Sequence, residues 1–489
     1  MSFASIDFLI FLSLVCLVYY IIPHRVRKIF LLYCSYVFYM WWNASYALLM
    51  LASTVITFCC GIGMDYVEKQ SRPGLRKNIL CLGILLNLGI LFFFKYFNFC
   101  FGTMDKVLTF LGAKATGITI DLLLPIGISF YTFQVIGYMI DVYRGDVKAE
   151  RNFVDYAIFI SFFPQLLAGP IGRSKNLLEQ IKEKHKFSIN NFQMGVWYIA
   201  WGYFLKLVIA DRIAIFVDLV YTNLDVYVGL YIVFATILFA VQIYCDFNGY
   251  TMIARGAARI LGFELIDNFS APYLSQTVAE FWRKWHISLT SWFRDYLYIP
   301  LGGNRRGKYR KYINTLFVFL SSGLWHGASW GYVIWGGLNG IYMLIEDLLF
   351  THRKQEKTKN RVFSHKIVNL VKTFLLVDFS WIFFRAAGIK ESYIAIKNMF
   401  TYFNPEIFFD GSIISVWMSS TEMLFLAIAV IVLVWVDYMK YKGIDVLQKI
   451  MGQEFWFRVL VFNILVVVVF MLGIYGQDYD SSKFIYFQF

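Results

Sequence analysis

Two histidines near the middle of the chain have neighbours suited to acid–base chemistry. His286 lies in FWRKWHISL and His326 in LWHGASW, within a largely apolar chain. A neutral imidazole accepts a proton from a hydroxyl group, and desolvation favours that neutral form. Ionisable side chains at membrane depth are costly to bury and are functional candidates. We therefore predict that His326 is catalytic and that His286 belongs to the same machinery, either acting chemically or holding its wall.

Glycines flank His326 at positions 323, 327 and 331. Glycine removes side-chain bulk, so a substrate or a neighbouring backbone can approach closely. The same pattern is expected if His326 only hydrogen-bonds between helices and the glycines are packing residues. Both interpretations stay open at this point.

Aromatic and basic residues alternate around His286, which predicts an amphipathic helix at the lipid interface. The aromatic residues of this helix are Trp282, Trp285, Trp292, Tyr296 and Tyr298. Most of them are expected to anchor the helix. Arg283, Arg294 and Arg305 either help to anchor the helix or contact the phosphate of an anionic donor, because guanidinium groups bind phosphate in a bidentate manner. Trp325, next to His326, is predicted to contact the same donor.

Two carboxyl groups and a broken helix lie near these residues in the apolar sequence. Asp246 in QIYCDFNGY and Glu280 before FWRKW can each pair with an arginine or orient a histidine, and pairing for stability is the commoner use. Pro164 in FFPQLLAGPIGR interrupts a helix. Gln165 then lines a cavity, or the segment is a plain kink.

Several classes of protein are disfavoured by motifs that the sequence lacks. It contains no G-x-S-x-G, Walker A, H-E-x-x-H or H-x4-D pattern, which argues against a serine hydrolase, an ATPase and a zinc protease. Its seven cysteines form no C-x-x-C pair and are interpreted as small buried hydrophobic residues. No metal site and no permanently bound cofactor are expected.

The elements that must position these residues are membrane helices. Of the 489 residues, 59% are hydrophobic and only 16% are charged, too few to cover a soluble surface. Apolar stretches of roughly 18 to 25 residues recur, each able to cross a ~30 Å hydrocarbon layer. The net charge of +13 falls in short loops between them, which is typical of cytoplasmic loops and does not indicate nucleic acid. The predicted fold class is all-α, a polytopic bundle in contact with lipid in the cell (inner or plasma) membrane.

The apolar segments predict the helices. They lie near residues 3–22, 29–42, 45–64, 78–101, 120–140, 153–170, 192–220, 228–248, 312–330, 331–350, 367–385, 414–438 and 456–476. Their lengths predict about 11 spans, with further re-entrant or interfacial helices. Neither a repeat nor a linker is found, so we predict a single membrane domain over residues 1–489. Basic residues follow segment 3–22 and none precedes it, which predicts a retained first helix with its N-terminus outside.

Charge bias predicts which connections face the cytoplasm. The basic connections are His24–Lys28, Arg144–Arg151, Gly172–Lys186, His352–Lys372 and the region from Arg283 to Lys311. Between Lys311 and His352 there is room for two crossings and a tight glycine-rich turn. If residues 312–326 are helical, His326 lies roughly 22 Å along the axis from the basic cluster, at ~1.5 Å per residue. His326 is then deep in the bilayer with His286 on its cytoplasmic side, which suggests a passage.

Taken together, these segments resemble the membrane-bound O-acyltransferases. The resemblance rests on YTFQVIGYMIDVYRGDVKAERN, FFPQLLAGPIGR, KLVIADRIA, CDFNGYTMIARGAARILGF, NFSAPY, FWRKWHISLTSWFRDYLYIPLGGNR, SGLWHGASW and the terminal FIYFQF. It runs from about Leu124 to the C-terminus, with a signature core over about residues 124–350. The branch that the chain resembles is the membrane subunit of bacterial alginate O-acetylation.

The resemblance implies a helical bundle around a central tunnel, with an acyl group taken from a cytoplasmic thioester. The donor would be acetyl-CoA or an acyl carrier protein. His326 would be the catalytic histidine and His286 the second signature histidine. In the polysaccharide branch the acetyl group passes to the outer face. There a partner acetyltransferase of the serine (SGNH) type esterifies the hydroxyl groups of a polysaccharide such as alginate.

Two other functions are weighed against this one. D-alanyl transfer to teichoic acid belongs to a branch that shares both histidines, although the GPIGRSKNLLEQI stretch and the FIYFQF end look more like the polysaccharide branch. A transporter or flippase would use the histidines to relay protons. Transporters often show two matching halves with broken helices, and the sequence has no such symmetry.

Overall fold

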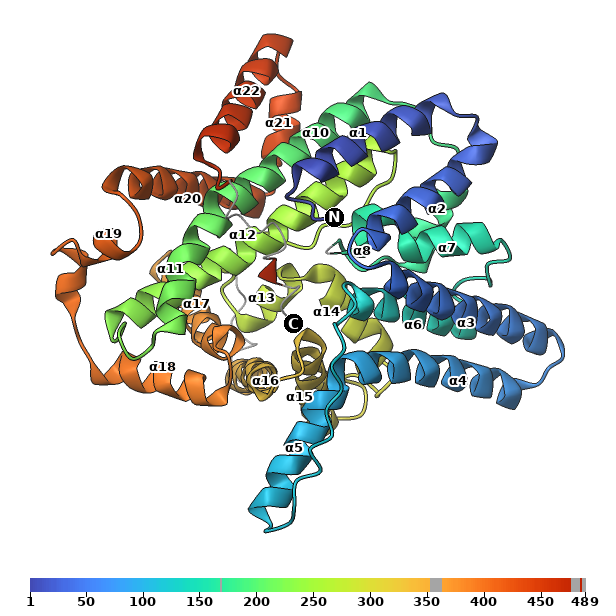
Figure 1. Cartoon of the computed structure of the whole chain (residues 1–489), viewed down its shortest axis with the longest axis horizontal. Coiled ribbons are helices and arrows are strands. Elements are labelled where there is room, and N and C mark those ends of the chain that lie inside the picture. The colour runs from blue at the N-terminus through green and yellow to red at the C-terminus, as the bar shows by residue number, and fades with distance from the viewer. Residues whose placement is uncertain (168, 352–362, 476–483, 486–489) are drawn as a thin grey trace. The chain divides into compact units, whose positions relative to one another are not determined.

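The computed structural model describes residues 1–167, 169–351, 363–475 and 484–485, and all regular structure in them is helical (Figure 1). The predicted all-α fold is confirmed. The chain forms two compact units, one of Met1–Val196 with Ala254–Ile266 and one of Trp197–Ile253 with Asp267–Phe489. The single membrane domain over residues 1–489 remains a prediction.

The first unit is built mainly from the N-terminal helices. They are α1 (Ile6–Ile21), α2 (His24–Met40), α3 (Ala44–Lys69), α4 (Pro73–Leu91), η1 (Phe92–Tyr96), α5 (Phe97–Phe110), α6 (Ile128–Arg144), α7 (Phe153–Ser161), α8 (Phe163–Leu166), η2 (Ser174–Leu178), α9 (Glu179–Lys182) and most of α10 (Ile189–Tyr203). Helices α3, α4 and α6 pack on one another, as Figure 1 shows. Asn43 and Asn152 accept backbone N–H groups at the starts of α3 and α7, which satisfies donors that a helix cannot pair internally.

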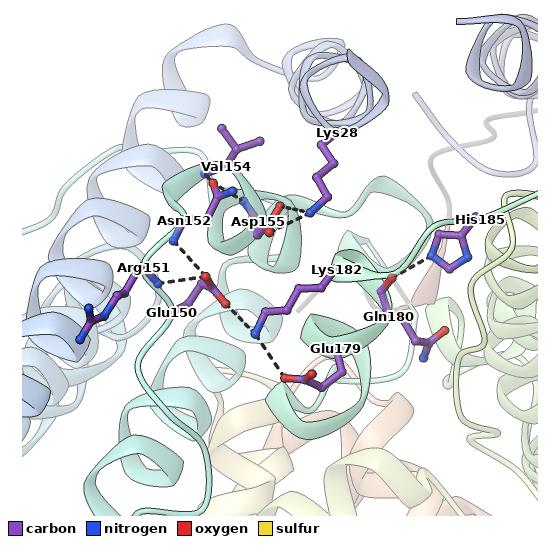
Figure 2. Close-up of polar contacts among 10 residues, drawn as sticks. All are labelled: Lys28, Glu150, Arg151, Asn152, Val154, Asp155, Glu179, Gln180, Lys182 and His185. Carbon is purple, nitrogen blue, oxygen red and sulfur yellow. Dashed lines mark hydrogen bonds and ion pairs between the residues drawn. The ribbon is translucent and has the colours of Figure 1, made fainter. Parts of the chain in front are cut away.

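A polar network joins the segment before α7 to α9 in this unit (Figure 2). The Glu150 carboxylate accepts the backbone N–H groups of Arg151 and Asn152, each at 2.9 Å, and pairs with Lys182 Nζ at 2.9 Å. Burial by itself would raise the pKa of Glu150, but the Asn152 N–H and Lys182 outweigh it and lower that pKa. The network therefore fixes two of the predicted basic connections against each other.

The second unit holds the remaining helices. They are η3 (Phe204–Ala210), α11 (Asp211–Thr222), α12 (Leu230–Ile260, as far as Ile253), η4 (Pro272–Leu274), α13 (Val278–Lys284), α14 (Ile287–Phe293), η5 (Arg294–Tyr298), α15 (Lys308–His326), α16 (Trp330–Thr351), α17 (Phe363–Arg385), α18 (Ile389–Thr401), η7 (Pro405–Phe408), α19 (Ser412–Val416), α20 (Ser420–Tyr441), α21 (Val446–Met451) and α22 (Phe455–Leu472). The stretch predicted to cross twice after Lys311 forms two helices, α15 and α16, joined by residues 327–329. Neither is among the candidate spans of the described residues, so the two crossings stay a prediction.

Within the described ranges, six helices are long and apolar enough to cross a membrane. They span Ala44–Lys69, Pro73–Phe110, Leu230–Ile260, Phe363–Arg385, Ser420–Tyr441 and Phe455–Leu472. Shorter apolar helices cover Ile6–Ile21 and Phe153–Leu166. A helical membrane bundle is thus confirmed, whereas the total of about 11 spans stays a prediction.

Some predicted boundaries were wrong for local reasons. The helix expected over 120–140 begins only at Ile128, because Pro125 precedes it and Gly127 takes φ +76°. The basic stretch His24–Lys28 forms the first turn of α2 and is not a connection. Much of the basic stretch His352–Lys372, and the last four residues of FIYFQF, lie outside the described residues.

Candidate active site

The structure brings His286 and His326 side by side within the second unit. Their ring centroids lie 6.3 Å apart with the ring planes inclined by 64°. Both side chains are buried, with exposed fractions of 1% and 3%. His326 therefore does not face lipid. The order of the two along a passage across the membrane, and their catalytic roles, remain predictions.

His326 ends α15 and lies among aromatic rings from three helices. Trp325 lies 5.0 Å from it and 6.0 Å from His286, between ring centroids. Trp335 on α16 and Phe384 on α17 lie 5.0 and 5.5 Å from the His326 ring. Such a lining excludes water, which strengthens polar interactions made inside it.

His286 lies at a break between two short helices. It takes φ +43° and ψ +55°, the left-handed region, and separates α13 from α14. It lies outside the six candidate spans, and burial lowers the pKa of its imidazole to about 3. The ring is therefore neutral at physiological pH and able to accept a hydrogen bond. The Phe247 ring from α12 packs against it at 4.7 Å.

The break at His286 corrects one prediction. A single amphipathic interfacial helix was expected here, with most aromatic residues acting as lipid anchors. Four of the five aromatic residues are buried instead: Trp282, Trp285, Trp292 and Tyr296. The left-handed residue 286 divides the stretch into two short helices, and the aromatic residues pack inside the unit; Trp285, for example, packs on Phe269, Phe281 and Trp381.

The three arginines proposed for phosphate lie apart from the buried histidine pair. Arg283 on α13, Arg294 at the start of η5 and Arg305 in the loop before α15 are all exposed. Arg294 Nε also donates to Asp295 Oδ1 at 2.8 Å. The structure thus assigns Trp325 to the histidine site and the arginines to the surface of the same unit.

The glycines around His326 are accounted for by packing. A Cβ on Gly323 would overlap the Tyr332 carbonyl oxygen, and one on Gly327 would overlap the Tyr332 ring. A Cβ on Gly331 would lie 2.7 Å from the Phe383 carbonyl oxygen. These contacts show that the glycines allow close packing around His326, and the catalytic role of His326 stays a prediction.

Asp246 and Glu280 each pair with a lysine. Lys206 Nζ, with 1% of its side chain exposed, lies 2.6 Å from Asp246 and 2.7 Å from Asp211. Asp246 Oδ2 also accepts the backbone N–H of Ile485 at 2.9 Å. Glu280 pairs with Lys284 on α13 at 2.6 Å. Pairing, the commoner of the predicted uses, is thus what the structure shows, but the predicted arginine partner was wrong, because lysines occupy those places.

The C-terminal residues that are described lie against α12 near the histidines. The buried Phe484 ring stacks on Tyr250, with centroids 4.0 Å apart and planes at 21°, and lies 6.2 Å from Phe247.

In the first unit, Gln165 is buried and donates to Gln134 Oε1 at 2.7 Å. Gln165 therefore belongs to a buried side-chain pair in the first unit.

Sequence reasoning missed several residues that shape the site. Lys206 carries a signal that would have found it, a lone charge within the apolar run WGYFLKLVIA. Trp335 and Phe384 carry none, because one apolar side chain among many does not show which partner it will meet in the fold.

Comparison with known proteins identifies the class to which this site belongs. A sequence profile of the membrane-bound O-acyltransferase family (MBOAT) matches residues 148–388, which include both histidines. The probable alginate O-acetylase AlgI of Pseudomonas aeruginosa is 38% identical over 411 residues, covering 82% of this chain and 75% of that protein. The chain belongs to the membrane-bound O-acyltransferase family. It is an acyltransferase of the membrane.

Other relatives in the family carry different names. The peptidoglycan O-acetyltransferase of Helicobacter pylori is 33% identical, covering 76% of this chain and 73% of that protein. The teichoic acid D-alanyltransferase of Streptococcus thermophilus is 29% identical, covering 48% of this chain and 60% of that protein.

Proposed function

We propose that this chain moves an acetyl group from a cytoplasmic thioester across the membrane for O-acetylation of an exopolysaccharide such as alginate. The observation that carries the proposal is the buried pair of His286 and His326, 6.3 Å apart, in a chain whose relatives are named alginate O-acetylases. A central tunnel through the bundle would bring donor and acceptor to that pair.

His326 would act as the general base. It takes the proton of the acceptor hydroxyl while that oxygen attacks the thioester carbonyl carbon. A C–O bond forms, the C–S bond breaks, and the imidazolium returns the proton to the departing thiolate. His286 is the neutral imidazole beside it, and Trp325 packs against both rings. The aromatic lining keeps water from competing with the acceptor hydroxyl.

The donor would be acetyl-CoA or an acyl carrier protein, both of which carry phosphate. The exposed Arg283, Arg294 and Arg305 are suited to bind that phosphate. On the outer face, a partner acetyltransferase of the serine (SGNH) type would receive the acetyl group and pass it to the polysaccharide. The donor is a substrate, and no bound cofactor is required.

Acetyl is favoured over D-alanyl as the transferred group. The relatives named O-acetylases and O-acetyltransferase cover 76 to 82% of this chain at 33 to 38% identity. The D-alanyltransferases cover only 48 and 53% at 29 and 26% identity.

Polymer acetylation in cells tests the proposal. His326→Ala is expected to lower the acetyl content of the secreted polymer by about 10²- to 10⁴-fold, the usual contribution of a general base. His365→Ala is the matched control, because His365 is an exposed histidine on α17. Unchanged acetylation by a His326→Ala protein that is present in the membrane at wild-type level contradicts the enzyme proposal and favours a transporter. D-alanyl esters in place of acetyl esters would contradict the branch.

A further inference from the structure

His286 adopts a backbone conformation that its surroundings must enforce. It is one of three non-glycine residues with positive φ in the described ranges, at φ +43°. The left-handed region costs an L-residue about 1 to 2 kcal/mol, and such a conformation persists only where neighbouring structure overdetermines it. In this conformation the imidazole of His286 lies 6.3 Å from that of His326, between ring centroids, and its Nδ1 lies 3.5 Å from Ser288 Oγ of α14.

His286 also occupies the N-cap position of α14 without capping that helix through its side chain. It is the N-cap of α14, and N-cap side chains normally accept a backbone N–H of the first helical turn. The His286 side chain makes no such capping bond. The first-turn donors of α14 therefore need an acceptor from elsewhere, because unpaired buried N–H groups are costly.

Asn268 supplies that acceptor from a segment 18 residues earlier. Its backbone carbonyl accepts the N–H of Ile287 at 3.0 Å, and its side-chain Oδ1 accepts the N–H of Ser288 at 3.3 Å. These are the two residues that follow His286. Ser270 N–H donates to the Lys284 carbonyl at 3.0 Å, so the same segment also holds the chain before His286.

Asn268 is itself held in place. Its exposed fraction is 0%, and its Nδ2 donates to Thr251 Oγ1 on α12 at 3.4 Å. Residue 251 lies one helical turn after Phe247, whose ring packs on the imidazole of His286. The amide of Asn268 thus connects α12 with the turn at His286.

We propose that Asn268 is a positioning residue, which caps α14 in place of His286 and so keeps the imidazole of His286 directed at His326. Thr251 acts through Asn268 by orienting its amide. The proposal rests on the proposed function, since the effect of a misplaced imidazole is seen only in acyl transfer.

Acetyl transfer from labelled acetyl-CoA in inverted membrane vesicles tests this role. Asn268→Ala is expected to lower kcat by about 10- to 100-fold, because small misplacements of reacting groups have effects of that size. The KM for acetyl-CoA should change by less than about 2-fold, since no donor contact is removed. Asn268→Asp is expected to restore kcat to within about 3-fold of wild type, because Asp and Asn cap helices about equally well.

A double-mutant cycle and a matched control complete the experiment. Thr251→Val should lower kcat in the wild-type background and have no further effect with Asn268→Ala. Asn87→Ala, which removes a buried asparagine in the first unit, should leave kcat unchanged. The inference is overturned if Asn268→Ala has wild-type kcat, or if Asn268→Ala and Asn268→Asp lose activity and thermal stability equally. A wild-type protein without acetyl transfer would instead contradict the proposed function.

Discussion

At the scale of single residues, His286 combines a strained left-handed backbone with an imidazole that lies at the proposed catalytic site. Its left-handed backbone ends α13 and starts α14, and the same turn places its imidazole 6.3 Å from that of His326. Strained residues of this kind are held in place by the structure around them and cluster at functional sites. We therefore expect the left-handed backbone of His286 to matter for the site as much as its imidazole does.

Replacing His286 separates the two contributions. His286→Gly and His286→Ala both remove the imidazole and should both abolish acyl transfer. The Gly variant should be more stable than the Ala variant by about 1 kcal/mol, because only glycine adopts positive φ without a steric cost. Thermal unfolding in detergent measures the difference. An Ala variant as stable as the Gly variant would show that the left-handed conformation is not maintained.

At the scale of helices, α15 and α16 carry the site through close backbone contact. His326 lies at the end of α15, and Trp335 on α16 packs on its ring at 5.0 Å. A Cβ on Gly336 would overlap the Phe319 carbonyl oxygen of α15, whereas one on the adjacent Gly337 would meet only the Leu320 Cδ2 at 3.4 Å. The approach of the two helices therefore depends on position 336 and not on 337.

Alanine at these two adjacent glycines gives a matched pair. Gly336→Ala must push α15 and α16 apart, which moves Trp335 from His326, and we expect acetyl transfer to fall by about 10-fold or more. Gly337→Ala should stay near wild-type activity, because the flexible Leu320 side chain can give way. Polymer acetyl content measured at equal membrane levels decides the comparison. Equal activity of the two variants would show that helix contact at 336 does not position the site.

The network around Glu150 predicts how the first unit responds to acid. The pKa of Glu150 is lowered in the folded protein, so its ionised form stabilises the fold above the ordinary value of 4.5. That stabilisation is lost as the pH falls through the lowered pKa. Glu150→Gln should therefore be less stable than wild type at pH 7 by about 1 kcal/mol, with the gap closing below pH 4.5. Thermal midpoints across that range measure it, and a gap that widens in acid would contradict the assignment.

At the scale of the whole molecule, the distribution of charge predicts the orientation in the membrane. Six helices among the described residues can cross a membrane, and basic residues gather in the segments between them, as the positive-inside rule requires of cytoplasmic loops. The cytoplasmic thioester donor and the external acceptor that we propose require this polarity. The orientation is therefore part of the proposed function.

Cysteine labelling tests the orientation. Lys148 and Lys184 are exposed and lie in two of the predicted cytoplasmic connections. In a variant with the seven native cysteines replaced, Lys148→Cys and Lys184→Cys should resist a membrane-impermeant maleimide in intact cells. Both should react in inverted vesicles. Reaction in intact cells would reverse the predicted topology.

Much of the fold and part of the site were predictable because they depend on local sequence. An apolar run predicts a membrane helix independently of the rest of the fold, because a helix satisfies its backbone hydrogen bonds within its own segment. The turn between α15 and α16 was predicted from the glycine-rich sequence around it, and His286 and His326 stood out as ionisable groups in apolar sequence. Membership of the acyltransferase family, which the comparisons confirm, was contained in the same segments.

Only the tertiary structure decided how these residues meet. The aromatic residues around His286 alternate with basic ones as they would in an interfacial helix. The local sequence does not predict the left-handed residue at 286, or that most of these aromatic residues are buried. The capping of α14 by Asn268 joins residues that no periodicity relates. Helical period is a property of neighbouring residues, whereas a buried polar contact depends on which distant segment supplies the partner. The sequence by itself therefore determined that the chain forms membrane helices, that it belongs to the acyltransferase family, and that His286 and His326 are the candidate site residues. Only packing determined the geometry that places the rings of these two histidines 6.3 Å apart.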